Sequence, residues 1–482
     1  MSILHAQIPT VTVIPGDGIG PEVSEVTLGL MEAAGARIEV ELADAGGKAF
    51  KSGIESGVPA ETIDSIARNK LVLKGPLETP IGYGNKSANV TLRKFFETFA
   101  NIRPARELPG VPTPFAGRGI DLVIVRENVE DLYSGIEHMQ TPNVAQCLKV
   151  ISKLGSQRIS RAAFEYARAQ GRKSVVVATK SNIMKLTEGL FKREFEGMAR
   201  EFPDISSSHI LIDNCAHQMV IRPEQFDVIV TTNMNGDIIS DLASGLVGGL
   251  GFAPSANIGY EVAMFEPVHG SAPDIAGKEI ANPTAMILSA VMLLRHIGQF
   301  ESAGRLERAL LTTLEAGIHT KDIPGGSALS TREFVEAVKE RIYKGADQET
   351  KISQPLEFTR VPKSVAEIIP GSRKKVGADV FIETNDSPEQ ISEKLKLAVW
   401  ETPFKLKMIS NRGTQVWPAT GTTPALVDVF RCRFTVANYS SWHVDPTLEL
   451  LKKVGSCYRW MHVEKLEEID GEIGFTKAQG EN

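Results

Sequence analysis

The stretch Leu122-Val123-Ile124-Val125-Arg126-Glu127-Asn128 joins an uninterrupted apolar run to three polar residues. Apolar residues without polar alternation predict a strand that is buried on both faces. Four further runs have the same character: Val11–Ile14, Val72–Leu73, Ser174–Ala178 and Val228–Thr232. Between them lie amphipathic helical patterns, namely Pro21–Ala34, Ala60–Arg68, Ser160–Ala169 and Thr187–Glu201. This alternation predicts an α/β sandwich with a largely parallel sheet.

The length and charge of the chain limit what it does. Its 482 residues correspond to roughly three domains at about 150 residues each. The net charge of −6 excludes a nucleic-acid-binding surface spread over the whole molecule. The longest apolar stretch, Ala285–Leu294, is too short to span a bilayer, and the N-terminus lacks a secretory pattern. Four widely spaced cysteines indicate a reducing compartment. We expect a cytoplasmic protein with no nucleic-acid or membrane partner.

The C-terminal part has a different organisation. Prolines and the basic cluster Arg373-Lys374-Lys375 are typical of a linker. Beyond it the predicted order is strand, helix, strand, strand, helix, strand, over Val380–Glu383, Pro388–Trp400, Lys405–Ser410, Val429–Val436, Pro446–Val454 and Tyr458–Lys465. This order predicts a ferredoxin-like α+β domain over residues 373–482.

A glycine-rich turn follows the first predicted strand. Gly16-Asp17-Gly18-Ile19-Gly20-Pro21-Glu22 invites a dinucleotide-binding interpretation, but the third glycine of G-x-G-x-x-G falls at Pro21. Taken alone, the pattern favours structural glycines between a strand and a helix.

Arginines follow or end predicted elements at several points. Ser87-Ala88-Asn89 leads to Arg93, with Arg103 further on and Arg126 at the carboxyl end of an apolar strand. Open α/β sheets bind ligands at that end, and guanidinium groups grip carboxylates in bidentate fashion. A polyanionic carboxylate ligand and a solvated basic face both fit this pattern.

Two aspartates lie at helical spacing in Asn235-Gly236-Asp237-Ile238-Ile239-Ser240-Asp241. Like charges at i and i+4 share one helix face and are destabilising unless neutralised, so a bound Mg²⁺ or Mn²⁺ is one interpretation. The other is a helix start, with Asp237 as the N-cap and Asp241 in solvent.

Four further residues indicate a function only when they are considered together with the other motifs. His269 begins a loop of small residues, and Lys180 and Asn182 follow the strand Ser174–Ala178. Such loops let backbone N–H groups approach a phosphate or adenosine closely. Lys180 and Tyr133 suit acid and base roles if burial and charge shift their pKa values.

Together these segments resemble the β-decarboxylating dehydrogenases, the family of isocitrate and isopropylmalate dehydrogenases. The resemblance covers about residues 10–345 and rests on the glycine turn, Arg126-Glu127-Asn128, Asn235–Asp241 and His269-Gly270-Ser271-Ala272-Pro273. It implies a fold distinct from the Rossmann fold. The large domain would comprise residues 1–98 and 248–345, the small domain with its dimer clasp 99–247, and a linker 346–372.

The resemblance also implies a role for each site residue. Ser87 and Asn89 match the isocitrate branch, where the isopropylmalate branch has apolar side chains. The implied substrate-binding set is Ser87, Asn89, Arg93, Arg103, Arg126 and Asn182. Tyr133 and Lys180 match the catalytic pair, and the implied ligands of Mg²⁺ or Mn²⁺ are Asp237, Asp241 and Asp213 of the partner subunit. The implied cofactor-binding residues are Thr79, His269, Gly270, Ser271, Ala272, Pro273, Asp274, Ile275 and Asn282.

By this resemblance the expected reaction is the oxidative decarboxylation of isocitrate to 2-oxoglutarate and CO₂, a step of the tricarboxylic acid cycle. The expected assembly is a homodimer with shared active sites, in which Lys180 acts across the subunits. The alternatives are a homoisocitrate, isopropylmalate or tartrate dehydrogenase, against which Ser87 and Asn89 argue, and a catalytically silent regulatory subunit. Retention of Tyr133 and Lys180 argues against the silent subunit.

The expected cofactor is NAD. Relatives that use NADP often carry Lys-Tyr where this chain has Asp274-Ile275, and their later Tyr and Arg appear here as Lys321 and Gly325. At ~4 Å and an effective dielectric near 20, Asp274 would repel each charge of a 2′-phosphate by about 4 kcal/mol. Lys321 would soften this effect, so that use of both cofactors stays open.

The C-terminal domain resembles that of extended isocitrate dehydrogenases from thermophilic bacteria, for instance at Phe404–Val416 and Phe475–Gly480. Its ferredoxin-like order is also typical of small effector-binding modules. Oligomerisation, including a higher oligomer than the dimer, is the simpler expectation, because exposed sheet edges pair readily.

Overall fold

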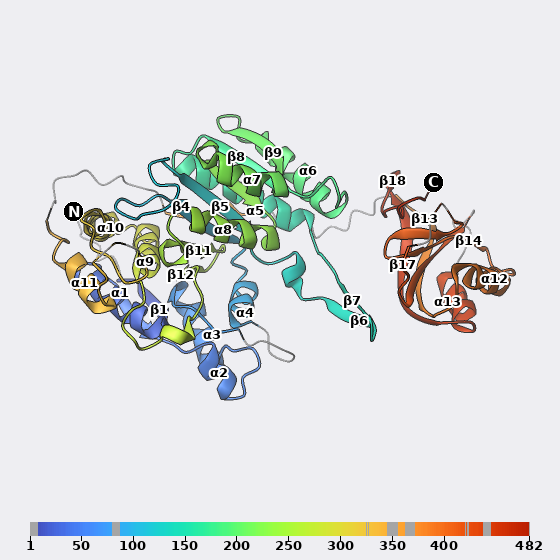
Figure 1. Cartoon of the computed structure of the whole chain (residues 1–482), viewed down its shortest axis with the longest axis horizontal. Coiled ribbons are helices and arrows are strands. Elements are labelled where there is room, and N and C mark those ends of the chain that lie inside the picture. Colours follow the sequence, from blue (N-terminus) through green and yellow to red (C-terminus); the bar gives the residue numbers. More distant parts are fainter. Residues whose placement is uncertain are drawn as a thin grey trace, which may run out of the picture. The chain divides into compact units, whose positions relative to one another are not determined.

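The computed structural model describes residues 8–79, 87–323, 325, 327–344, 355–361, 372–419, 421, 424–436 and 445–481. The chain divides into two compact units (Figure 1). Unit 1 comprises Met1–Ser134 and Lys149–Pro362, and unit 2 comprises Gly135–Leu148 and Lys363–Asn482. Most of the expected linker 346–372 lies outside the described residues. No helix in the described ranges has the length and apolar character needed to cross a membrane.

Unit 1 is built on one ten-stranded sheet in the order β2-β1-β3-β12-β11-β4-β5-β10-β8-β9. Six strand pairings are parallel and three are antiparallel. All five predicted strands are confirmed, but the antiparallel centre β12-β11-β4-β5 was not foreseen. The strands are β1 Thr10–Ile14, β2 Glu39–Leu42, β3 Leu71–Lys74, β4 Ala100–Arg106, β5 Asp121–Glu127, β8 Ser174–Thr179, β9 Ser206–Leu211, β10 Val228–Thr231, β11 Pro254–Ile258 and β12 Ala263–Pro267.

Helices cover both faces of this sheet (Figure 1). They are α1 Gly20–Ala33, α2 Gly47–Lys51, α3 Ala60–Asn69, α4 Ala88–Phe95, α5 Lys153–Ala169, α6 Thr187–Ala199, α7 Ile212–Ile221, α8 Asn233–Leu246, α9 Thr284–His296, α10 Phe300–Glu315 and α11 Thr331–Lys339. Short 3₁₀ helices are η1 Leu132–Ser134, η2 Pro223–Gln225, η3 Leu250–Phe252 and η4 Pro273–Ile275.

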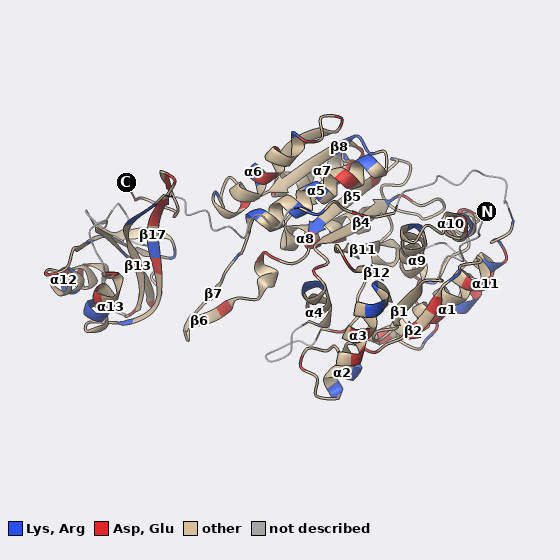
Figure 2. Cartoon of the chain, turned by 180° about the vertical axis from the view of Figure 1, so that it is seen from behind, with Lys and Arg blue, Asp and Glu red and all other residues tan. Residues whose placement is uncertain are grey.

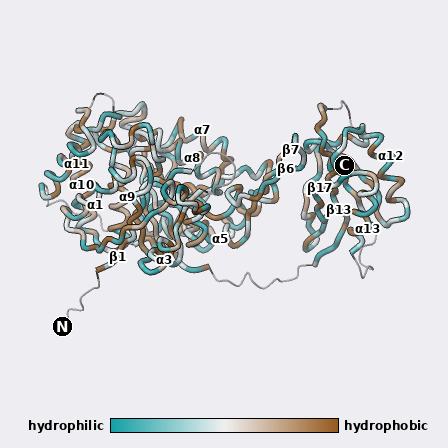
Figure 3. The backbone as a smooth tube through the Cα atoms, turned by 90° about the horizontal axis from the view of Figure 1, so that it is seen from below, coloured by the Kyte–Doolittle hydropathy of each residue, from teal (hydrophilic) through white to brown (hydrophobic). Residues whose placement is uncertain are grey.

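The side-chain alternation of β5 shows how one apolar run serves two cores. Val123 and Val125 belong to the core shared with α5 and α6, whereas Leu122 and Ile124 belong to the core shared with α7 and α8. Because successive residues of a strand point to opposite faces, a run without polar residues fits only a strand covered on both sides. Figure 3 shows hydrophobic residues along the inner trace of unit 1 and hydrophilic ones on its outer helices. Basic and acidic residues are interspersed along the helices (Figure 2).

The C-terminal domain of unit 2 confirms the ferredoxin-like prediction. The core of its antiparallel sheet has the order β14-β16-β13-β17, with β15 and β18 at the edges. Its helices pack on the sheet through Ile391, Leu395, Leu450 and Val454. The elements are β13 Arg373–Glu383, α12 Pro388–Ala398, β14 Phe404–Asn411, β15 Thr414–Trp417, β16 Val429–Val436, α13 Thr447–Gly455, β17 Arg459–Ile469 and β18 Glu472–Ile473.

A hairpin from the middle of the chain completes unit 2. It consists of β6 Glu137–Thr141 and β7 Val144–Cys147. Thr141 Oγ1 and Asn143 Nδ2 donate to the Asp428 carboxylate at 3.1 and 2.9 Å. The sequence placed these residues in a small domain, 99–247, and the structure groups them with the C-terminal residues. The division into two units does not separate the expected large and small domains, so those boundaries stay a prediction.

Candidate functional site

Arg126 lies at the carboxyl end of β5, as the sequence predicted, and its side chain is only 1% exposed. Its Nε donates to the backbone oxygen of Asn233 at 2.9 Å, and its Nη2 donates to Asn233 Oδ1 at 2.8 Å. Asn233 is the first residue of α8, and Asp237, which also contacts the guanidinium, lies one turn further. The start of α8 therefore fixes the position of Arg126.

Asp237 is the point where several predicted site residues meet. Arg103 Nη1, from β4, lies 3.1 Å from Asp237 Oδ1 and 3.7 Å from Asp241 Oδ1. The hydroxyl of Tyr133, in η1, donates to Asp237 Oδ2 at 2.5 Å. Because α8 begins at Asn233, Asp237 lies inside the helix and the helix-cap interpretation is excluded.

The charged side chains around Asp237 shift one another's pKa values. Burial would raise the pKa of Asp237, but Arg126 and Arg103 more than offset it and hold that pKa below its usual value. Burial, together with the neighbouring Asp237, raises the pKa of Asp241. Burial and repulsion by Arg103 and Arg93 lower the pKa of Arg126 to about 9. The crowded guanidinium groups favour a ligand that brings negative charge.

A buried ion cluster holds Arg93, at the C-terminal end of α4. Arg93 Nη2 donates to Glu266 Oε1 at 2.8 Å, and the other carboxylate oxygen pairs with Lys74. Lys74 ends β3, Glu266 lies near the end of β12, and both side chains are less than a tenth exposed. No sequence motif assigned a role to Lys74 or Glu266, although each is a polar residue at the end of an apolar run, the same signal that singled out Arg126.

One chain of hydrogen bonds links Arg93 to Arg103. Glu266 Oε1 also accepts from Asn257 Nδ2 at 2.7 Å, and Asn257 Oδ1 accepts from Asn101 Nδ2 at 2.6 Å. Asn101 Oδ1 then accepts from Arg103 Nε at 2.9 Å. The asparagines lie in the paired strands β11 and β4, and no motif marks them in the sequence. These unforeseen residues connect Arg93 and Arg103, two of the predicted substrate-binding arginines, through hydrogen bonds.

A cavity of about 360 Å³ opens beside this network. Three buried atoms of its lining have no hydrogen-bond partner among the described residues: Asn89 Oδ1, Arg93 Nε and His269 Nε2. Burial lowers the pKa of His269, so that its ring is neutral near pH 7. The predicted residues that line the cavity are Thr79, Asn89, Arg93, Arg103, His269, Gly270 and Ser271. Unpaired polar atoms around a cavity fit a ligand that supplies their partners.

The predicted cofactor residues outside this lining are Ala272, Pro273, Asp274, Ile275 and Asn282. Ser87, a predicted substrate-binding residue, also lies outside it, and its Oγ is 3.1 Å from Oγ1 of the lining residue Thr79. Asp274 is exposed in η4, which follows Ala272. Asn282 uses both ends of its amide on neighbours, since Nδ2 donates to Asp322 at 3.0 Å and Oδ1 accepts from the Thr284 N–H at 3.0 Å.

The glycine turn supports the loop that carries His269. Gly18 has φ +57°, and a Cβ atom there would lie 1.9 Å from the backbone oxygen of Ser271. The N–H of Ile19 donates to that same oxygen at 2.9 Å. Only glycine allows this close approach with a positive φ. The structural interpretation of these glycines is therefore supported, and their role is to position the loop.

Lys180, Asn182 and Asp213 form a separate group. Lys180 follows β8, and its Nζ pairs with Asp213 Oδ1 of α7 at 2.9 Å. Asn182 is exposed. Within the described part of one chain, no hydrogen bond or ion pair joins this group to Asp237 or Tyr133, and no three His, Cys, Asp or Glu side chains converge on a possible metal position. Asp237 and Asp241 nevertheless supply the carboxylate oxygens that Mg²⁺ and Mn²⁺ prefer.

Two family models match the chain. Residues 10–338 match the isocitrate/isopropylmalate dehydrogenase family, and residues 373–481 match the C-terminal domain of bacterial isocitrate dehydrogenase. A relative from Thermus thermophilus, named isocitrate dehydrogenase [NADP], is 59% identical and covers 100% of this chain and 98% of its own length. A relative of the same name from Rickettsia conorii is 41% identical over 99% of this chain and 100% of its own length.

The expected preference for NAD is wrong, because these two full-length relatives are named as NADP enzymes. The expectation used an effective dielectric of about 20 for the repulsion between Asp274 and a 2′-phosphate. The structure places Asp274 at the exposed surface. In water a like-charge pair at ~4 Å costs only about 1 kcal/mol, and salt screens it further. Asp274 is therefore a weak barrier to a 2′-phosphate.

A solved structure confirms the predicted architecture. The crystal structure of the TT0538 protein from Thermus thermophilus superimposes with a TM-score of 0.95 at 59% identity, covering 100% of this chain and 98% of that chain. The α/β sandwich and the C-terminal antiparallel domain are thus shared by both proteins. With both family models matched, the chain belongs to the isocitrate/isopropylmalate dehydrogenase family and carries the C-terminal domain of its bacterial isocitrate dehydrogenases.

Proposed function

We propose that this protein catalyses the metal-dependent oxidative decarboxylation of isocitrate to 2-oxoglutarate and CO₂, with NADP as the hydride acceptor. The observation that carries the proposal is the convergence of Arg103, Arg126 and Tyr133 on Asp237. This arrangement supports the proposal because it brings together guanidinium groups that would bind carboxylates, a phenol that would donate a proton and a carboxylate that would bind the metal.

The arginines account for the charge of the substrate. Isocitrate carries three carboxylates, and Arg93, Arg103 and Arg126 supply three guanidinium groups joined by one network. Mutual repulsion of these groups is relieved when a polyanion binds between them. Ser87 and Asn89, at the N-terminal end of α4, would bind the carboxylate that isopropylmalate lacks.

Asp237 and Asp241, with Asp213 of the partner subunit, would hold the metal. Mg²⁺ or Mn²⁺ at this place supplies Lewis-acid stabilisation of negative charge on the substrate oxygen. Arg103 Nη1 lies 3.1 Å from an oxygen of Asp237 and 3.7 Å from an oxygen of Asp241, so it contacts both carboxylates.

Lys180 and Tyr133 would each carry out a different proton transfer. Lys180 would relay the proton of the 2-hydroxyl away while hydride leaves carbon 2 for the nicotinamide. The carboxyl group on carbon 3 leaves as CO₂, and Tyr133 would donate a proton to carbon 3. Burial, and the hydrogen bond to Asp237, raise the pKa of Tyr133, so its phenol is protonated near pH 7.

The assembly that fits this chemistry is a homodimer with shared sites. Lys180 and Asp213 pair with each other on the surface of one chain, and within its described residues they form no ion pair with Asp237. A second subunit that brings its own Lys180 and Asp213 would complete the site. We also propose that the C-terminal domain serves in assembly.

Initial rates of the isolated protein test the proposal. With Mn²⁺ and NADP we expect turnover of isocitrate, and rates at least a hundredfold lower for isopropylmalate and homoisocitrate. Release of one CO₂ per NADPH formed is the expected stoichiometry. A preparation that binds isocitrate and Mn²⁺ but turns over none of these acids would instead be a silent regulatory subunit, and the proposal would fail.

A further inference from the structure

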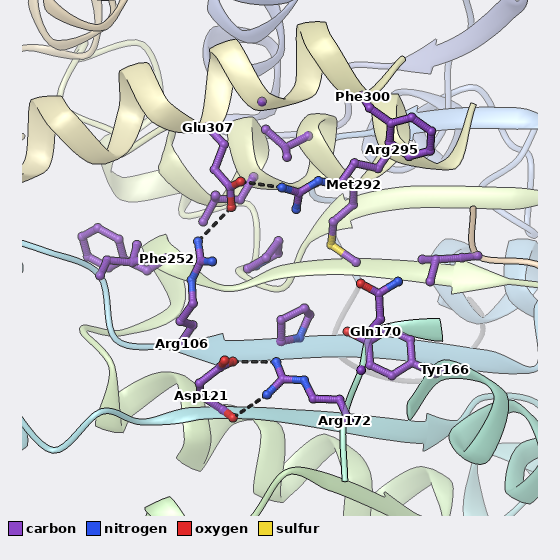
Figure 4. A pocket seen from close by; sticks show the side chains of 18 of the residues that line it. Arg106, Asp121, Tyr166, Gln170, Arg172, Phe252, Met292, Arg295, Phe300 and Glu307 are labelled. Carbon is purple, nitrogen blue, oxygen red and sulfur yellow. Dashed lines mark hydrogen bonds and ion pairs between the residues drawn. The ribbon is translucent and has the colours of Figure 1, made fainter. Parts of the chain in front are cut away.

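A second cavity lies at the opposite end of β5 from Arg126. Its volume is about 600 Å³, and β4, β5, α5, α9 and α10 contribute to its lining (Figure 4). Asp121, the first residue of β5, lines it, and Arg126 lies five residues further, roughly 17 Å along the strand. The two cavities share no lining residue. Neither the family models nor the proposed reaction gives this cavity a role.

The carboxylates that line this cavity already form ion pairs with arginines. Glu307 accepts from Arg106 at 2.9 Å and from Arg295 at 2.5 Å. Arg172 donates to Asp121 at 2.6 Å and, from its other terminal nitrogen, to Asp227 at 3.0 Å. Figure 4 shows these two clusters on opposite sides of the cavity. The three acidic side chains thus have cationic partners already.

The polar groups that are left over are mainly donors. Arg308, on α10, has no ion pair or side-chain hydrogen bond to any residue in the described ranges, and the same holds for the Gln170 amide. Tyr166 lies one helical turn before Gln170 on α5 and presents a hydroxyl to the cavity. Burial raises the pKa of Tyr166 to about 12, which keeps that hydroxyl a donor. A cation without a carboxylate partner among the described residues, in a lining that also offers neutral donors, favours an anion.

The remaining wall is apolar and only half-buried. Met292 and Phe300 line the cavity from α9 and α10, and Leu356 reaches it from the later segment 355–361. Figure 4 shows the Met292 side chain extending between the two charged clusters. A thioether adapts its shape to a flat ring, and aromatic rings stack on Phe. This wall fits an apolar ring system better than a small hydrated ion.

We propose that this cavity is a second binding site, specific for an anion with an aromatic body. Arg308 binds the anionic group, Tyr166 and Gln170 donate to polar atoms elsewhere on the ligand, and the wall of Met292 and Phe300 covers the ring. The site is distinct from the cavity beside Arg93 and Arg103, because the two share no lining residue.

The test uses 8-anilinonaphthalene-1-sulfonate, an aromatic sulfonate whose fluorescence rises on transfer to an apolar site. The full-length protein is titrated with isocitrate and Mg²⁺ at saturation, and separately with NADP at saturation. We expect one saturable phase per chain that neither condition displaces. Arg308→Gln should weaken it by about tenfold, and Met292→Glu by about tenfold or more.

Arg305→Gln is the matched control, because Arg305 is on the same helix but pairs with Glu301 and the Ala34 carbonyl outside the cavity. It should leave the dissociation constant unchanged, and all three variants should keep wild-type turnover, which shows that they are folded. Displacement by NADP or isocitrate would overturn the proposal. So would equal binding to wild type, Arg308→Gln and Met292→Glu, because the dye would then be bound elsewhere.

Discussion

The hydroxyl of Tyr133 donates a 2.5 Å hydrogen bond to Oδ2 of Asp237, whose other oxygen meets Arg103 and Arg126. One carboxylate is therefore bonded to the candidate proton donor and to two candidate substrate-binding groups. Any ligand that binds the Asp237 carboxylate also changes the environment of Tyr133. Substitutions at these residues and in the network behind them test this coupling.

Tyr133→Phe should separate binding from chemistry. The variant keeps the ring beside Arg126, whose guanidinium carbon lies 5.1 Å from the ring centroid, and loses only the proton donor. We expect kcat to fall by about a hundredfold or more, with the isocitrate KM within a few fold of wild type. Steady-state rates measure both. Tyr343→Phe, which removes a hydroxyl bonded to the Ala33 carbonyl at the surface, is the control and should have no effect. A large rise of KM with unchanged kcat would assign Tyr133 to binding.

Asp241→Asn should weaken metal binding. Asp241 is half-exposed and contributes one of two carboxylates on α8, so its loss should raise the Mn²⁺ concentration for half-maximal rate by about tenfold or more. Because burial and Asp237 raise the pKa of Asp241, protons compete with the metal, and the wild-type Mn²⁺ requirement should rise as the pH falls toward 5. Chelation of metal by EDTA should abolish turnover, and Mn²⁺ should restore it. Full activity in EDTA would refute a metal role.

Glu266→Gln should destabilise the fold through Lys74. The substitution leaves a buried ammonium beside Arg93 without its anion, which typically costs about 3–5 kcal/mol. Urea unfolding at pH 7 measures this cost. The double variant Lys74→Met, Glu266→Gln should be less destabilised than Glu266→Gln alone, because the uncompensated charge is gone. Additive losses would show that the two residues do not act as a pair.

Glu127 should make stability depend on pH. Burial raises the pKa of Glu127 from its usual 4.5 to about 7, so the folded state binds a proton that the unfolded state releases. Stability from this group is complete below pH 4.5 and is lost as the pH rises through 7. Glu127→Gln removes the titration, so relative to wild type it should gain about 2–3 kcal/mol between pH 4.5 and pH 8. Urea midpoints at pH 5 and pH 8 provide the comparison. An equal offset at both pH values would contradict the shift.

Mixed dimers should reveal shared active sites. In the proposed homodimer, Lys180→Met and Tyr133→Phe should each inactivate both sites of a dimer that carries only that variant. If the two residues meet across subunits, a hybrid dimer carries one intact site and one doubly altered site. Random mixing after refolding should then restore about a quarter of wild-type activity. Recovery of none, with hybrids shown by mass spectrometry, would place Lys180 and Tyr133 of one chain in the same site.

The sequence predicted the strands that are continuous apolar runs, and it missed the antiparallel centre of the sheet. β4 contains Arg103, Pro104 and Arg106, and proline argues against a central strand. The structure tolerates Pro104 because β11 pairs only with Ala100–Ile102, so that Pro104 has a single neighbour in β5. Which strands lie at the centre of the sheet depends on pairing between residues distant in the sequence. No local sequence pattern shows that pairing.

The candidate site was predicted best where a residue ends a strand or belongs to a motif. Arg126 and Asp237 meet as expected, whereas Lys74, Asn101 and Asn257 act through partners far along the chain. The charge of Asp274 was visible in the sequence, but its exposure was not, and exposure decides how strongly it repels a phosphate. Sequence thus identifies the candidate ligand-binding groups better than the residues that hold those groups in position.

The proposed reaction is tested most directly by kcat/KM of the isolated protein with isocitrate and Mn²⁺, measured in parallel with NADP and with NAD. We predict turnover with one CO₂ released per reduced cofactor and a higher kcat/KM for NADP. The absence of turnover with both cofactors, in a preparation shown to bind isocitrate and Mn²⁺, would contradict the proposal.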